Sequence, residues 1–160
     1  MTASEALALL ETTPRRVTEV SAGITAEHLR TPPSPGEWSA VEILAHIRSC
    51  ADVRGSAVLR ILAEDHPTIR PVSPRIYQRG TDYVELEFAP SLRAFADRRA
   101  DLLAVLEPLP SEAWGRSARI LKDGKELEWS VLYYADWIGS HERIHIAQIE
   151  ATVETIAATL

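Results

Sequence analysis

The sequence predicts an all-α protein that folds as a four-helix bundle. Four stretches carry apolar residues at helical spacing, proline-rich connections separate them, and no segment shows a convincing strand pattern. No internal repeat divides the chain, and 160 residues suit one domain with its own core. We therefore predict a single domain over residues 1–160, with a long connection between the second and third helices.

The first helix is predicted from about Ser4 to Ala22. Apolar residues recur three or four positions apart along it, and Gly23 is a stop signal. Pro14 interrupts the pattern and is expected to kink the helix. The segment Thr31–Gly36 that follows contains three prolines and cannot be helical.

The second helix is predicted from Ser39 to about Glu64. Ser39 and Glu42 form the S-x-x-E capping box directly before an apolar run, which is a strong start signal. His46 falls on an inward face of this helix, among apolar neighbours. The polar residues of the same helix are expected on its solvent side: Arg48, Asp52, Arg54 and Arg60.

The second half of the chain contains the two remaining helices. A connection from Pro67 to Phe88 is long enough to be functional or to carry its own packing. The third helix is predicted from near Pro90, a favourable first-turn residue, to Pro108. Asp123-Gly124 is a turn signal, and the fourth helix is predicted from about Trp129 to Ala158.

The fourth helix contains His141-Glu142-Arg143-Ile144-His145. Two histidines four residues apart lie one turn from each other on one helix face, so both imidazoles can bind a single ion. The string also matches the H-E-x-x-H pattern of zinc peptidases. A metzincin would have Gly at 148 and His at 151, where this chain has Gln148 and Ala151, and no sheet is predicted that could hold a substrate peptide. These differences argue against a peptidase.

The candidate for a third metal ligand is His46. A buried imidazole needs partners for both nitrogens, and a metal ion can be one of them. The alternative is a core histidine bonded to a neighbouring carbonyl, but the pair His141 and His145 in the same bundle interior favours the metal. Three neutral histidines leave a coordination position open, which is typical of a Lewis-acid site, and imidazoles favour Zn or Ni.

Three segments carry a family resemblance. Gly36–His46, with the sequence GEWSAVEILAH, resembles the helix-two motif of the DinB/YfiT-like superfamily, and His141–Ile149 resembles its helix-four motif H-x-x-x-H-x-x-Q-I. The segment from Arg98 through Leu109, followed by Trp114, resembles its third helix and exit loop, so the resemblance covers essentially the whole chain. It implies a metal-binding four-helix bundle with His46, His141 and His145 as ligands, and it implies possible homodimerisation.

Four further residues have two interpretations each, and a fifth, Cys50, has one. Glu142 either acts as a general base beside the ion or forms an ion pair, and Gln148 either hydrogen-bonds within the site or is a buried polar spacer. Arg99 lies on an apolar stripe, where it either reaches an anionic substrate or keeps its charged end in water. Trp137 either lines a substrate pocket or closes one end of the bundle. Cys50 is expected to be a small buried hydrophobic residue.

Composition limits the functional classes. A net charge of −6 without a basic block argues against a nucleic-acid partner. One cysteine, Cys50, excludes an internal disulfide and a cysteine-based structural zinc site. Neither a secretory signal nor an apolar run of about 20 residues is evident, so we expect a cytoplasmic protein without a membrane partner, acting on a small-molecule substrate.

The resemblance also bears on activity. The superfamily includes thiol-dependent transferases and isomerases, so the function expected first is metal-assisted transfer of a low-molecular-weight thiol to a small electrophile. An open three-histidine site could instead serve a hydrolase. From a different class, the protein could be a non-catalytic binder of a metal or a small molecule.

Overall fold

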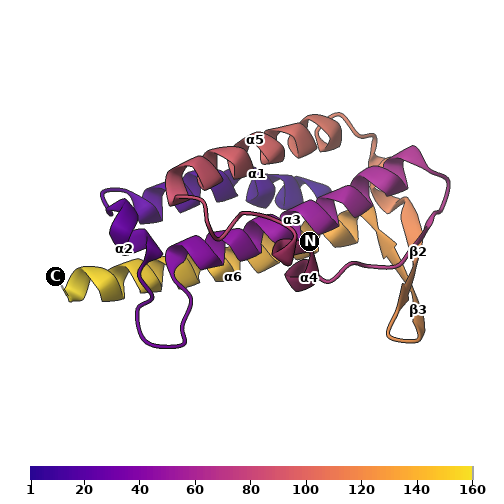
Figure 1. The fold of residues 1–160 in the computed structure, drawn as a ribbon. Helices are drawn as coiled ribbons and strands as arrows, with labels where there is room; N and C mark the ends of the chain where they lie inside the picture. Colours follow the sequence, from indigo (N-terminus) through magenta and orange to yellow (C-terminus); the bar gives the residue numbers. More distant parts are fainter. Residues whose placement is uncertain (160) are drawn as a thin grey trace.

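A computed structural model describes residues 1–159 and contains four long helices (Figure 1). These are α1 (Ala3–Ser21), α3 (Ala40–Ala63), α5 (Phe88–Leu106) and α6 (Val131–Ala158). Three short helical segments and three strands lie between them: α2 (Ala26–Arg30), α4 (Pro74–Arg79), η1 (Ser111–Gly115), β1 (Thr68–Ile69), β2 (Ser117–Lys122) and β3 (Lys125–Ser130).

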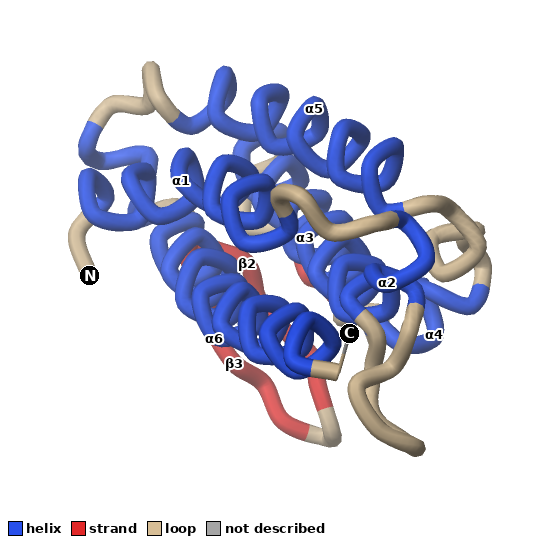
Figure 2. The backbone as a smooth tube through the Cα atoms, turned by 90° about the vertical axis from the view of Figure 1, so that its left-hand side faces the viewer, coloured by secondary structure: helices blue, strands red, loops and turns tan. Residues whose placement is uncertain are grey.

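The long helices form a four-helix bundle, as predicted. Helix α6 packs against α1 and α3, and α5 packs against the same two helices from the other side. Each helix therefore has two neighbours around a common interior, which Figure 2 shows obliquely. No helix within residues 1–159 has the length and apolar content needed to cross a membrane.

Local sequence signals define the helix ends. Ser39 and Glu42 form the predicted capping box at the start of α3, with side-chain to backbone distances of 3.2 Å in both directions. Helix α5 begins at Phe88, two residues before Pro90, so the proline lies within the first turn, where its missing N–H costs no hydrogen bond. Gly23 follows α1 with φ +77°, a conformation that glycine adopts without strain.

The prediction that the chain has no strand is wrong. Strands β2 and β3 form an antiparallel hairpin, and β1 adds a short parallel strand beside β2. Asp123 and Gly124, identified only as a turn signal, have φ of +52° and +72°, which suits the two-residue turn of a β-hairpin. The fourth helix consequently begins at Val131, because Trp129 belongs to β3. The hairpin lies at the end of the bundle away from the C-terminus (Figure 1).

The connection between α3 and α5 is ordered on the outside of α3 by a buried carboxylate. Asp52 is only 7% exposed and accepts hydrogen bonds from the hydroxyl groups of Tyr77 and Tyr83. The guanidinium of Arg98 lies 3.7 Å from the same carboxylate. The prediction that Asp52 faces solvent is therefore wrong, because the connection folds back over it.

The core consists of two apolar clusters separated by a polar layer. One cluster, at the hairpin end, includes Leu10, Ile61, Leu106 and Ile138, and the other includes Val17, Ile43, Phe95 and Ile149. Between the two clusters, α1, α5 and α6 contribute the buried polar residues Thr13, Arg99 and Glu142, and α3 contributes Ser49 and Asp52, which face the connection that follows it. Buried polar side chains are costly unless they are paired, so this layer is where function is to be sought.

Candidate metal centre

The structure brings the three predicted histidines together beside the polar layer. Nε2 of His141 lies 3.2 Å from Nε2 of His46 and 3.1 Å from Nε2 of His145. His141 and His145 are one turn apart on α6, and His46 comes from α3, which packs against α6. Nε2 of His141 thus lies next to a ring nitrogen from α3 and to another from α6.

Two tryptophan rings contact the imidazole rings. The ring of Trp137 stacks on His141 at 4.5 Å between centroids and an angle of 14°, and Trp38 lies 5.2 Å from His46. Trp137 precedes His141 by one helical turn, which places the two rings on the same face of α6. The predicted substrate role of Trp137 stays a prediction, and its observed contact is with a candidate ligand.

The donor set fits a divalent ion. Two imidazole nitrogens bound to one ion at about 2.1 Å would lie roughly 3.0–3.4 Å apart, which matches the observed separations. Burial, followed by the charge of His145, lowers the pKa of both His46 and His141 to about 4. Both rings are therefore neutral at pH 7, as metal coordination requires. The arrangement thus supports His46, His141 and His145 as ligands for a metal such as Zn or Ni.

One of the three histidines has an orienting hydrogen bond. Nδ1 of His145 lies 2.7 Å from Oε1 of Gln148, which fits Nδ1–H donating to the amide oxygen and leaves Nε2 with a free lone pair. Gln148 is exposed, so the interpretation as a buried spacer does not fit. Nδ1 of His141 is buried without a partner among residues 1–159.

The hydrogen bond from His145 predicts that Gln148→Leu weakens metal binding about 10- to 100-fold, because it removes the acceptor that orients the imidazole. Competition against a chromophoric chelator would measure the dissociation constant. Gln148→Glu, which keeps an acceptor, is the matched control and should bind at least as tightly as the unmodified protein. Equal affinity in the leucine variant would show that Gln148 does not orient the ligand.

Cys50 lies closer to the histidines than expected for a purely apolar residue. Its Sγ is 3.7 Å from Nε2 of His46, and donor atoms of His46, Cys50 and His141 all lie within 4.8 Å of one another. Burial raises the pKa of the thiol to about 12, and only a thiolate is a good metal ligand. We therefore prefer the three imidazoles as the donor set. The sequence signal for this proximity is the spacing of four residues, or one helical turn, between His46 and Cys50.

Arg99 and Glu142 form a buried ion pair with each other. Their side chains are 2% and 1% exposed, and the guanidinium bonds both carboxylate oxygens, at 2.9 and 2.5 Å. Arg99 also donates to the carbonyl of Leu10 at 2.9 Å, so the pair links α5 and α6 to α1. The predicted roles of Arg99 in substrate binding and of Glu142 as a general base do not fit this arrangement, because neither charged group is free. The ion-pair interpretation of Glu142 does fit.

Cavities lie on both sides of the histidines along α3 and α6. One of about 490 Å³ opens beside His145 and Gln148 and is also lined by Trp38. Another of about 220 Å³ lies further along, between α3 and the connection that follows it, and is lined by Arg54 and Tyr134. The first therefore gives a small molecule access to His145.

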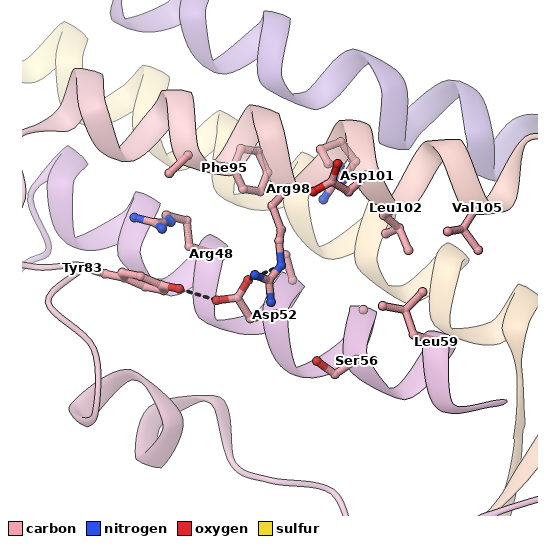
Figure 3. A pocket seen from close by; sticks show the side chains of 14 residues that line it. Arg48, Asp52, Ser56, Leu59, Tyr83, Phe95, Arg98, Asp101, Leu102 and Val105 are labelled. Atoms are coloured by element: carbon pink, nitrogen blue, oxygen red, sulfur yellow. Dashed lines mark hydrogen bonds and ion pairs between the residues drawn. The ribbon is translucent and has the colours of Figure 1, made fainter. Parts of the chain in front are cut away.

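A third cavity, of about 420 Å³, is separate from the histidines. It lies between α3 and α5 (Figure 3). Its polar end contains Tyr83, whose hydroxyl group points at Asp52, and its other end is lined by Leu59, Leu102 and Val105. The polar groups at this end are already paired with one another, since Tyr83 and Arg98 both contact the carboxylate of Asp52.

Comparisons with known proteins agree with the fold. Residues 9–149 match the DinB superfamily. A Geobacillus kaustophilus protein named "Putative metal-dependent hydrolase" is 27% identical over 150 residues, covering 91% of this chain and 82% of that protein. The structure of YfiT from Bacillus subtilis, described as "a probable metal-dependent hydrolase with an unusual four-helix bundle topology", superposes with a TM-score of 0.81 at 18% identity, over 97% of this chain and 87% of that one. The chain belongs to the DinB superfamily.

Proposed function

We propose that this protein is a metal-dependent enzyme that acts on a small molecule at the His46, His141 and His145 cluster. The observation that carries the proposal is that Nε2 of His141 lies 3.2 Å from Nε2 of His46 and 3.1 Å from Nε2 of His145. An ion held by three histidines, without a carboxylate completing the shell, keeps a coordination position for a reactant. The names of the two relatives, both called metal-dependent, support the same conclusion.

The chain's own residues would each have a defined task. His46 and His141 stay neutral because they are buried, and Gln148 orients His145. Trp137 limits the access of water to His141 by covering one ring face. A divalent ion bound there would supply Lewis acidity, which favours the deprotonated form of a bound nucleophile near neutral pH.

Within this proposal, the nucleophile we favour is the thiolate of a low-molecular-weight thiol that is transferred to a small electrophile. Glu142, the residue expected to deprotonate water in a hydrolase, is held by Arg99. Transfer of a thiol needs no such base once coordination has favoured the thiolate. Hydrolysis is the second candidate, and the names of both relatives favour it. Homodimerisation and a cytoplasmic location stay predictions.

Cobalt substitution tests the choice between the two reactions. Addition of a thiol such as glutathione to the cobalt-loaded protein is expected to produce a sulfur-to-metal charge-transfer band. The zinc-loaded protein should consume thiol in the presence of chlorodinitrobenzene faster than the metal-free protein. His141→Ala is the negative control, because it removes the central ligand.

Two other outcomes would assign the protein to a different functional class. A protein that gives no band and no thiol consumption, but turns over esters or amides in a metal-dependent way, is a hydrolase. A metal site that accepts neither thiol nor substrate, and whose loss unfolds the chain, would indicate a non-catalytic structural role. Glu142→Gln does not separate these reactions, since breaking its buried ion pair affects the fold as well.

A further inference from the structure

Arg54 on α3 is a half-buried cation without an anionic partner. Its Nε is buried and has no hydrogen-bond partner, and no ion pair joins its guanidinium to any of residues 1–159. An arginine carries five N–H donors, and withdrawing them from water without acceptors is costly. The sequence places this residue on the solvent side of its helix, so its partial burial is a property of the tertiary structure.

Aromatic rings hold this guanidinium in place without satisfying its donors. Its central carbon lies 4.2 Å from the ring centre of Trp137 and 5.5 Å from that of Trp129. Stacking of this kind orients the planar group while its N–H edge stays available for an acceptor. Trp137 also stacks on His141, so one indole ring contacts both the candidate metal ligand and Arg54.

The cavity of about 220 Å³ beside Arg54 has the character of a small-anion site. Arg54, Arg60 and Arg70 line it together with one carboxylate, Asp52, although the whole chain has a net charge of −6. Asp52 already accepts hydrogen bonds from two tyrosines, and Arg60 is paired with Glu64. Arg54 is thus the half-buried lining cation whose donors are uncommitted.

Most of the remaining lining is apolar, the exceptions being Ser56 and Tyr77, whose hydroxyl group donates to Asp52. Ala57, Ile69, Pro71, Val72 and the ring of Tyr134 surround the remaining space. A volume of about 220 Å³ is below the range for drug-sized ligands, which indicates a small guest. One free guanidinium matches the two oxygens of a carboxylate, whereas a phosphate would be expected to recruit more donors.

We propose that Arg54 binds the carboxylate of a small organic acid whose apolar body fills this cavity, next to the three-histidine cluster. The part of this proposal that makes the acid a substrate rests on the proposed function, while the binding itself does not. Arg54 lies two helical turns after His46 on α3, and its charge contributes, after burial and the neighbouring histidines, to the lowered pKa of His141. The geometric link between the two sites is Trp137, whose ring contacts both the Arg54 guanidinium and the imidazole of His141.

Calorimetric titration with benzoate tests the binding on the zinc-loaded full chain, with tryptophan fluorescence as a second readout. Arg54→Gln is expected to weaken benzoate binding about 10- to 100-fold, the usual effect of losing a charge-assisted bidentate contact. Arg54→Lys keeps the positive charge but loses the paired N–H donors of the guanidinium, so its benzoate affinity should lie between those of the unmodified protein and Arg54→Gln. Arg70→Gln removes the same charge from an exposed lining residue and should change the affinity little.

Three results would overturn the proposal. Benzoate affinity unchanged in Arg54→Gln would show that the carboxylate binds elsewhere, including on the ion. An equal loss in Arg70→Gln would show a general charge effect. Inorganic phosphate that binds more tightly than benzoate would show an oxyanion site of another kind. Neutral benzamide should bind the unmodified protein and Arg54→Gln equally.

The same titration on metal-free protein separates this proposal from the proposed function. If benzoate affinity still depends on Arg54 after the metal is removed, the anion site is supported independently of the metal site. A chain that binds no divalent ion but does bind benzoate through Arg54 would contradict the metal-dependent enzyme and leave this inference standing. Circular dichroism of each variant verifies that the helices are intact.

Discussion

Replacing His141 with alanine is expected to lower the metal content of the purified protein from about one divalent ion per chain to near zero. His141 is the central ligand, because its Nε2 lies 3.2 Å from that of His46 and 3.1 Å from that of His145. Its removal leaves two imidazoles from different helices, which are a weak site for Zn or Ni. Elemental analysis after dialysis would measure the content.

The control for this prediction is His28→Ala. His28 is in the short helix α2, where its Nδ1 lies 2.8 Å from the hydroxyl oxygen of Thr25, so it has a local role only. Its replacement should leave the metal content unchanged. Metal content that is also unchanged in His46→Ala, or in the double variant of His141 and His145, would exclude the three-histidine site.

Removal of the ion from the unmodified protein should leave the bundle folded. The two apolar clusters contain none of the three histidines, so the core does not depend on the metal site. Metal binding then adds to the free energy of unfolding only the free energy of binding to the folded state. Chelation is therefore expected to cost a few kcal/mol at most in the free energy of unfolding.

Arg99→Met is expected to lower the free energy of unfolding by about 3–5 kcal/mol, the usual cost of removing one partner from a buried ion pair. Glu142 would be left 1% exposed with a carboxylate that has lost both hydrogen bonds, and the carbonyl of Leu10 would lose a donor. Urea denaturation followed by circular dichroism would measure the change.

A second variant distinguishes pairing from packing. Replacing Arg99 and Glu142 together with apolar residues should recover most of the lost stability, because no buried charge then stays uncompensated. Arg16→Gln breaks the exposed pair with Glu19 and should change the stability by less than about 1 kcal/mol. If Arg99→Met lowers the free energy of unfolding by less than about 1 kcal/mol, water reaches Glu142 and the ion pair does not stabilise the bundle.

The ion pair also explains why the general-base role of Glu142 could not be excluded from sequence. Glu142 and Arg99 are 43 residues apart, and nothing in the spacing of either indicates the other. The periodicity of α5 does show that Arg99 lies on an apolar stripe. Which group satisfies that buried charge depends on how α5 packs across the interior from α6.

What the sequence determined by itself is local. The apolar periods of the four helices, the capping box of Ser39 and Glu42, and the one-turn spacing of His141 and His145 all depend on residues within a few positions of one another. These signals were sufficient for the bundle and for three histidines on inward faces. The Asp123-Gly124 turn and the alternation of polar and apolar residues on both sides of it are equally local, and together they indicate the β2–β3 hairpin.

What only the tertiary structure decided is the partner of each polar group. The enclosure of Asp52 by the connection from Pro67 to Phe88, the ion pair of Arg99 with Glu142, and the unpaired donors of Arg54 all involve segments distant in sequence. Periodicity shows which face of a helix a side chain occupies. Whether a charge on that face meets water, a counter-ion or a cavity depends on the neighbouring segments, because desolvation and pairing energies arise only when those segments pack together.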